Sequence, residues 1–196
     1  MKHWTPIVNK AFSPQDFPAY CAGVHLRDWH PDMIVLHNTG IPSLARWRTH
    51  TMEQHMLALQ HFYRDQQKWS AGPHLFIDDK QIGVFTPLDH HGVHSPSWNH
   101  RAWGVEMAGD YENEAFDPHV RANTISAIAA LCRLGHIKPG SLTICLHKED
   151  PRTTHDCPGK HVDKADILMA VAGEVERQLV GGGEHELSRT LTYGTS

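Results

Sequence analysis

Short apolar runs bounded by polar or turn-forming residues recur along the chain and predict strands. They are residues 33–37, 74–78, 81–85, 102–107 and 141–146. The first run is apolar up to its terminal His37, which is typical of a strand buried on both faces. The polar pair Asp79-Lys80 separates the second run from the third, so these two runs predict a hairpin.

Helical spacing of apolar residues occupies three other stretches. Thr51 begins a capping-box pattern, and the spacing that follows predicts a helix to about residue 67. Asp117 supplies an N-cap, Pro118 fits the first helical position, and Gly135 fits a C-cap, so a second helix is expected between them. A last apolar stripe predicts a helix from about residue 163 to residue 180.

This alternation of strands and helices predicts an α/β fold, with one central mixed sheet flanked by helices in a single domain. We expect that domain to span residues 30–180. Residues 1–29 contain several prolines and no sustained period, and we expect an irregular segment packed on the domain. Residues 181–196 begin with three glycines and are mainly polar, which favours a flexible tail.

Composition narrows the possible partners. Lys and Arg number 18 against 22 Asp and Glu, and there is no basic run, so we do not expect nucleic acid as a partner. The 18 histidines are unusual for a chain of 196 residues. Because histidine titrates near pH 6.5, mild acid would turn the net charge of -4 positive, and attraction to an acidic surface would then depend on pH.

The N-terminus lacks the apolar segment of a signal peptide, and no run approaches the roughly 20 apolar residues that cross a bilayer. We therefore expect cytoplasmic synthesis, no membrane insertion and a monomer. The chain has four cysteines, and if one of them binds a metal an odd number remains. This argues against a disulfide framework and favours a reducing compartment.

Three residues suggest a metal site. His147 and Cys157 lie ten residues apart on one expected loop, and His37 ends the first strand. Two imidazoles and a thiolate suit zinc and leave a fourth position for water. Alternatives remain open, because His37 could bond a backbone carbonyl and Cys157 could be a buried thiol. The spacing of His147 and Cys157 matches no compact metal motif.

Other residues near these segments offer proton transfer or substrate contacts. Glu106 lies in an otherwise apolar strand, where it either faces water or points into a site that uses it as a general base. His155 stands two residues before Cys157 and suits oxyanion stabilisation, unless it is an ordinary loop histidine. His94 belongs to a loop of aromatic, hydroxyl and amide groups that suits a sugar or peptide ligand, and His74 is expected to line the same cleft.

Taken in order, these blocks resemble a known family. The blocks are His37-Asn38-Thr39, Pro73-His74-Leu75-Phe76-Ile77, His94 with Asn99, Trp103-Gly104-Val105-Glu106, His147, and Cys157-Pro158-Gly159. They look like the zinc-dependent N-acetylmuramoyl-L-alanine amidases, a superfamily that includes phage T7 lysozyme, AmpD-type amidases and peptidoglycan recognition proteins. The resemblance covers roughly residues 30–180.

The resemblance implies zinc bound by His37, His147 and Cys157, and a catalytic role for Glu106. It also implies that His94 and Asn99 border the groove for peptidoglycan or muropeptides. Two positions depart from the family. Pro73 stands where phage T7 lysozyme-like members have a catalytic tyrosine, and His155 stands where many active members have lysine.

The resemblance implies zinc-assisted hydrolysis of the amide between the lactyl group of N-acetylmuramic acid and L-Ala. Glu106 would move the proton and His155 would help to hold the oxyanion. The absence of a signal peptide suits a phage or prophage endolysin released through a holin, or a cytoplasmic muropeptide-recycling amidase. A module that binds peptidoglycan without cutting it is the alternative from another class. A structural zinc protein is a third, which would need a fourth protein ligand.

Overall fold

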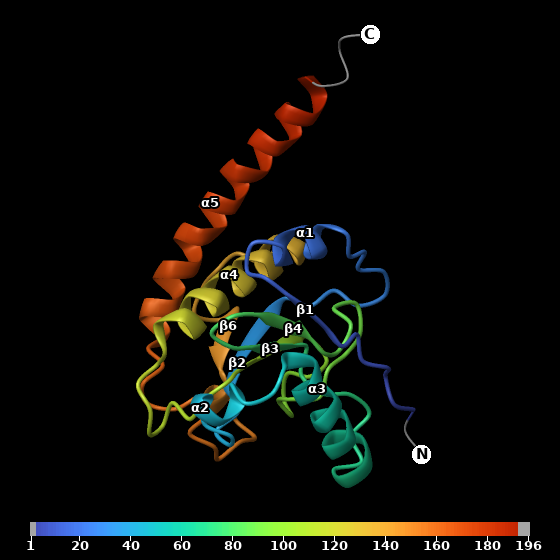
Figure 1. Ribbon diagram of the computed structural model, residues 1–196, viewed down its shortest axis with the longest axis vertical. Coiled ribbons are helices and arrows are strands. Elements are labelled where there is room, and N and C mark those ends of the chain that lie inside the picture. Colours follow the sequence, from blue (N-terminus) through green and yellow to red (C-terminus); the bar gives the residue numbers. More distant parts are fainter. Residues whose placement is uncertain (1–2, 192–196) are drawn as a thin grey trace.

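A six-stranded mixed sheet forms the centre of the computed structural model, which describes residues 3–191 (Figure 1). The strands are β1 (Lys10–Phe12), β2 (Met33–Asn38), β3 (Leu75–Ile77), β4 (Ile82–Val84), β5 (Ala102–Met107) and β6 (Ile144–Leu146). The helices are α1 (Phe17–Ala22), α2 (Leu44–Trp47), α3 (Met52–His61), α4 (Pro118–Leu134) and α5 (Lys164–Leu191). The expected α/β fold is confirmed.

The strands lie in the order β1-β4-β3-β5-β2-β6. β3, β5, β2 and β6 run parallel, whereas β4 pairs antiparallel with β3 as the expected hairpin and with β1 at the edge. In the parallel register between β2 and β5, His37 lies opposite Glu106. Carboxyl ends of parallel strands gather at one edge of the sheet, where ligand sites form in such folds.

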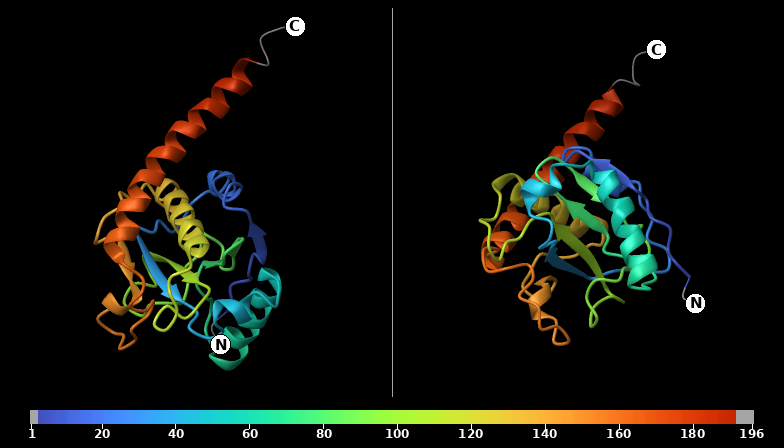
Figure 2. Two further views of the ribbon diagram at one scale, coloured as in Figure 1. Left: turned by 60° about the vertical axis from the view of Figure 1, so that its left-hand side comes forward. Right: turned by 60° about the horizontal axis from the view of Figure 1, so that its bottom comes forward.

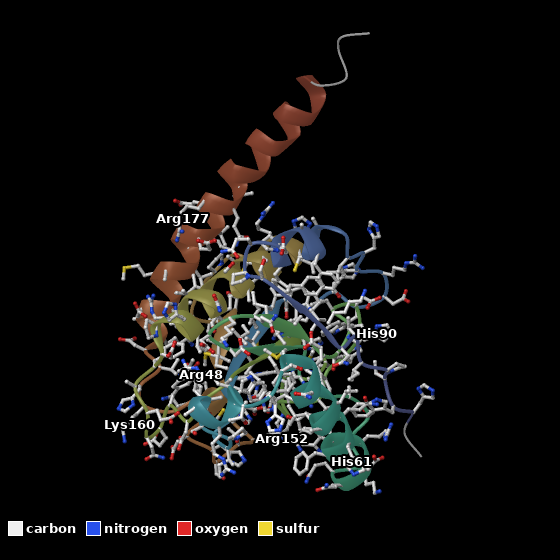
Figure 3. The ribbon with its side chains drawn as sticks, viewed as in Figure 1. Arg48, His61, His90, Arg152, Lys160 and Arg177 are labelled. Atoms are coloured by element: carbon white, nitrogen blue, oxygen red, sulfur yellow. The ribbon has the colours of Figure 1, made fainter. Side chains whose placement is uncertain are left out.

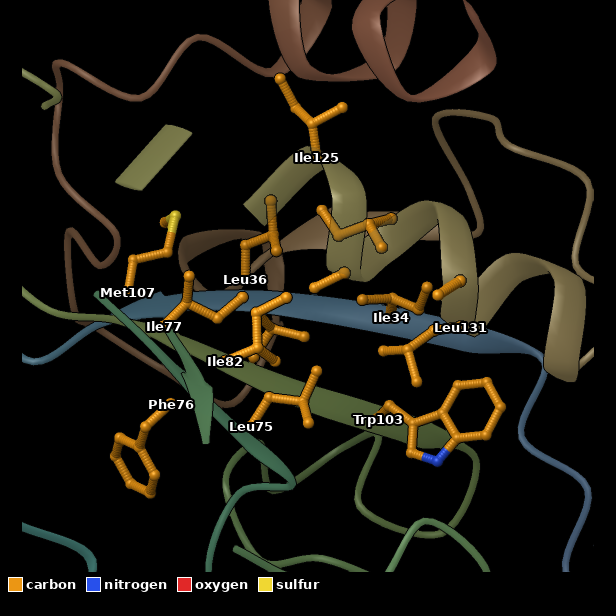
Figure 4. Packing of buried hydrophobic residues seen from close by; sticks show 14 of the residues in the cluster. Ile34, Leu36, Leu75, Phe76, Ile77, Ile82, Trp103, Met107, Ile125 and Leu131 are labelled. Atoms are coloured by element: carbon orange, nitrogen blue, oxygen red, sulfur yellow. The ribbon is translucent and has the colours of Figure 1, made fainter. Parts of the chain in front are cut away.

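One face of the sheet carries the main core. Ile34, Leu36, Trp103 and Met107 point to this face and are at least 95% buried. α4 packs on them through residues such as Leu131, whereas Ile125 points away from the strands, as Figure 4 shows. α1 and α5 flank α4 (Figure 2).

The opposite face is covered in two separate places. α3 lies over β4, where Met52 and Met56 fill the space left by Gly83, which has no side chain. At the β2–β5 side, a smaller cluster of Met33, Val35, Ala102 and Cys145 packs against Trp98. Side-chain alternation along β2 and β5 directs His37 and Glu106 to this same face.

The predicted helix caps are confirmed. Thr51 and Gln54 form the expected capping box at α3, which continues as a single π-helical turn, Phe62–Gln66. The side chain of Asp117 accepts two backbone N–H groups at the start of α4, with Pro118 in the first turn. Gly135 is the C-cap.

Both expected ends of the domain need correction. The N-terminal segment is not irregular throughout, because β1 pairs with the free edge of β4 and α1 packs on α4. It does pack on the domain, and the N–H of Val8 donates to the carbonyl of Phe85. α5 does not end at residue 180 but continues to Leu191, through the three glycines. Residues 192–196 of the expected tail lie outside the described residues.

The four cysteines are free thiols, and Cys21, Cys132 and Cys145 are buried. Between residues 3 and 191, none of the helices is both long enough and apolar enough to span a membrane.

Candidate metal centre and catalytic carboxyl

The three expected metal ligands converge. His37 ends β2, His147 follows the neighbouring parallel strand β6, and Cys157 ends the loop that begins at His147. One donor atom from each residue lies within 4.8 Å of the others. We call residues 147–157 the ligand loop.

Backbone hydrogen bonds hold the ligand loop closed. The N–H of Lys148 donates to the carbonyl of Cys157 at 2.7 Å, so the two ends of the loop are tied together. The N–H of Asn38, next to His37, donates to the Cys157 sulfur at 3.3 Å. These contacts bring the two loop ligands to the end of β2.

The donor set fits zinc. Burial lowers the pKa of both His37 and His147, which keeps the two imidazoles neutral and able to bind a cation. The Nε2 atom of His147 is buried and has no hydrogen-bond partner among the described residues, as expected of a ligand atom. Burial raises the pKa of the Cys157 thiol to about 12, and the Glu106 carboxyl adds to this, so a cation is needed to hold the thiolate.

Glu106 stands beside the cluster. Its Oε1 lies 4.0 Å from Nδ1 of His37, and 14% of its side chain is exposed toward solvent. Burial raises the pKa of this carboxyl to about 8. A carboxyl that titrates close to neutral pH and adjoins a metal-type cluster can both accept and return a proton.

His155 lies on the outside of the same site. Its ring centroid is 5.7 Å from that of His147, and the side chain is exposed. The structure therefore brings His155 next to a candidate ligand, on the solvent side. Arg152 is also exposed on the ligand loop (Figure 3).

The structure encloses His74 and His94, and the substrate contacts expected of them remain predictions. His74 is fully buried, accepts from the N–H of Gly104 and donates to the carbonyl of His90. His94 is 8% exposed, and its Nδ1 lies 3.1 Å from Nε2 of His37. Both rings are thus bonded within the protein, and His94 contacts the candidate ligand His37.

Asn99 also serves the protein itself. Its side-chain oxygen accepts the backbone N–H groups of His94 (2.8 Å) and Ser95 (2.7 Å). These bonds fix the conformation of residues 94–99, which we call the support loop. The side chain remains partly exposed, but its oxygen is committed to this loop.

Asp150 is a site residue that the sequence analysis missed. It is 1% exposed and accepts hydrogen bonds from the Ser95 hydroxyl (2.5 Å) and the Ser97 N–H (3.0 Å). Burial alone would raise its pKa, but the bonds from Ser95, Ser97 and the N–H of Arg152 outweigh burial and hold the pKa at about 2. Asp150 thus ties the ligand loop to the support loop. An acidic residue in a polar loop gave no pattern from which to predict this.

Three metal-type donors lie beside a carboxyl of raised pKa, at the end of the parallel strands. Metal-dependent hydrolases use this kind of arrangement. The family model described as N-acetylmuramoyl-L-alanine amidase matches residues 27–160. The chain belongs to this family, as the resemblance implied. A search of curated proteins gives no match.

Several solved structures are similar to this chain. The endolysin N-acetylmuramoyl-L-alanine amidase LysCS from Clostridium intestinale is 25% identical over 71% of this chain and 82% of its own, with a TM-score of 0.56. Drosophila peptidoglycan recognition protein PGRP-LB is 20% identical over 74% of this chain and 84% of its own (TM-score 0.59). A mutant endolysin from Bacillus subtilis is 23% identical over 76% and 92% (TM-score 0.55). The last two comparisons support the fold.

Proposed function

We propose that this protein is a zinc-dependent N-acetylmuramoyl-L-alanine amidase. It cleaves the amide between the lactyl group of N-acetylmuramic acid and L-Ala of peptidoglycan. The observation that carries the proposal is the position of the Glu106 carboxyl beside the cluster of His37, His147 and Cys157. Oε1 of Glu106 lies 4.0 Å from Nδ1 of His37. Family membership supports the choice of amide.

Each residue has a role in the proposed reaction. His37, His147 and Cys157 would hold zinc. When bound, zinc would polarise the carbonyl of the substrate and lower the pKa of a water molecule. Glu106 takes a proton from the attacking water and delivers it to the departing amide nitrogen, so that water and amide become a carboxylic acid and an amine. His155, on the solvent side, donates a hydrogen bond to the developing oxyanion.

The first test replaces Glu106 with glutamine. Glu106→Gln keeps the size of the side chain and removes its proton transfer, so we expect lysis of purified cell walls to fall by about 100-fold or more. Zinc content, measured on the same samples, should stay at one ion per chain. The matched control is Glu112→Gln, which alters an exposed carboxylate paired with Lys160. Wild-type lytic activity in a zinc-loaded Glu106→Gln protein would remove Glu106 from the reaction.

We further propose that the protein acts as an endolysin on intact walls. Endolysins among the similar solved structures support this setting. A muropeptide-recycling amidase would prefer soluble fragments. Turnover on intact sacculi should therefore exceed turnover on soluble muropeptides, and the reverse preference would favour recycling. If the wild-type protein binds sacculi and does not hydrolyse them, it is a binding module instead.

A further inference from the structure

We propose that His94 is a positioning residue that fixes the tautomer and direction of His37, so that Nδ1 of His37 is the atom presented to the metal. This inference rests on the proposed zinc site. It gives His94 a role behind the ligand. A backbone carbonyl behind His94 sets the tautomer of that ring, because a carbonyl can only accept a hydrogen bond.

That carbonyl belongs to Ala102 and lies 3.1 Å from Nε2 of His94. Nε2 of His94 must therefore carry the proton and donate. In a neutral imidazole the other nitrogen is then an acceptor, so Nδ1 of His94 accepts from Nε2 of His37 at 3.1 Å. With its proton on Nε2, His37 has a bare lone pair on Nδ1, which is also the nitrogen nearest Glu106.

The atoms around His94 restrict the position of its ring. Gly104 lies two residues before Glu106 on β5, and a Cβ atom there would come within 2.4 Å of Cγ of His94. The absence of a side chain at position 104 is thus what admits the ring beneath His37. The ring is otherwise enclosed, with 8% of the residue exposed.

The backbone of His94 is anchored on its other side. Asn99 accepts its N–H, and Ser95 and Ser97 bond to Asp150 of the ligand loop. The residue that orients one ligand is therefore fixed to the loop that carries the other two. Outer partners of this kind set the tautomer and direction of metal-binding histidines in general, and losing one typically costs 10- to 100-fold in metal affinity.

The first test measures zinc affinity by competition with a chromophoric chelator. His94→Phe keeps a buried ring but loses both bonds, and Gly104→Ala displaces the ring without changing it. We expect both variants to bind zinc about 10- to 100-fold more weakly than wild type. His94→Gln carries an acceptor and a donor in one side chain and should recover part of the loss. The control is Ile128→Ala on α4, which covers the far face of the sheet. It also removes buried side-chain volume, and it should keep wild-type zinc affinity.

The second test reads the tautomer directly. In metal-free wild-type protein, nitrogen-15 NMR of the histidine rings should show His37 protonated at Nε2 and bare at Nδ1, with Nδ1 shifting when zinc is added. In Gly104→Ala the two tautomers of His37 should be mixed. Protonation of His37 at Nδ1 in wild type would overturn the inference even if the His94 variants fail to fold. So would unchanged zinc affinity in both His94→Phe and Gly104→Ala.

These readouts separate the inference from the proposed function. If wild-type protein binds zinc and shows the expected tautomer but leaves cell walls intact, the positioning role stands and the amidase proposal fails. If walls are cut while the His37 tautomer is the opposite one, the amidase proposal stands and the positioning role fails.

Discussion

The histidines beside the sheet differ in what surrounds their rings, and this decides their roles. His37 and His147 converge on a third donor, whereas His94 and His74 are enclosed and bonded to backbone groups. His155 remains in solvent. Residue identity, together with the resemblance to the amidases, suggested the three-ligand cluster, whereas spacing alone did not. Identity and resemblance could not separate a ligand from the histidine behind it, because that distinction depends on which side chains the fold buries together.

The burial of His74 predicts a pH-dependent loss of stability. Burial, reinforced by His94, lowers the pKa of His74 to about 3, whereas the unfolded value is 6.5. The unfolded chain therefore binds a proton between these values that the folded chain does not, so stability falls as pH drops below 6.5. His74→Gln removes this proton. Between pH 7 and pH 5 the unfolding free energy of metal-free wild type should fall by about 2 kcal/mol more than that of the variant.

Urea unfolding at the two pH values measures this difference. His25→Gln, which alters an exposed histidine, serves as the control and should keep the wild-type pH dependence. Equal losses in wild type and His74→Gln would contradict the assignment of a neutral, buried His74.

At the level of elements, the sequence predicted the helices whose first residues carry a capping pattern. The capping box at Thr51 and the cap at Asp117 were visible in the sequence and are confirmed. β1 was missed because its three residues become a strand only by pairing with the edge of β4, a partner about 70 residues away. The helical continuation of α5 through Gly181–Gly183 was missed because glycine is a poor helix former.

The ligand loop depends on a glycine that follows Cys157. Gly159 has φ of +101°, and an added Cβ would lie 2.3 Å from the backbone carbon of Tyr111. Gly159→Ala should therefore destabilise the protein by about 2 kcal/mol or more and weaken zinc binding. Gly140→Ala is the matched control, because the nearest atom to its added Cβ is 3.7 Å away. Thermal unfolding with and without zinc checks both, and equal behaviour of the two variants would refute the close approach at Gly159.

At the scale of the whole molecule, the sheet separates support from chemistry. α1, α4 and α5 cover one face. The candidate site lies on the other face, where the ligand loop meets the end of β2. Most of the fold followed from the alternation of strands and helices. The closure of the site by Asp150 did not, because it joins two loops that no periodic pattern relates.

Net charge gives a prediction at this scale. The chain has 18 histidines and a net charge of -4 at pH 7, and burial lowers the pKa of His37, His74, His94 and His147. Because the reference pKa of histidine is near 6.5, we expect so histidine-rich a chain to become cationic near pH 5.5. The amount of Glu106→Gln protein that binds anionic sacculi should therefore rise when the pH falls from 7.5 to 5.5. This binding should disappear in about 0.5 M salt, because salt screens the attraction between exposed charges. Equal retention at both pH values would argue against a charge-driven contact.

The register of β2 against β5 constrains how this protein can change in length. Because side chains alternate along a strand, one residue inserted into or deleted from β5 before Glu106 would place Val105 or Met107 opposite His37. The carboxyl would then turn to the far side of the sheet, among the core residues beneath α4. Length changes between β5 and α4 leave the alternation intact. Natural variation in length should therefore collect in connecting loops such as residues 108–117, while the run from Ala102 to Glu106 keeps its residue count.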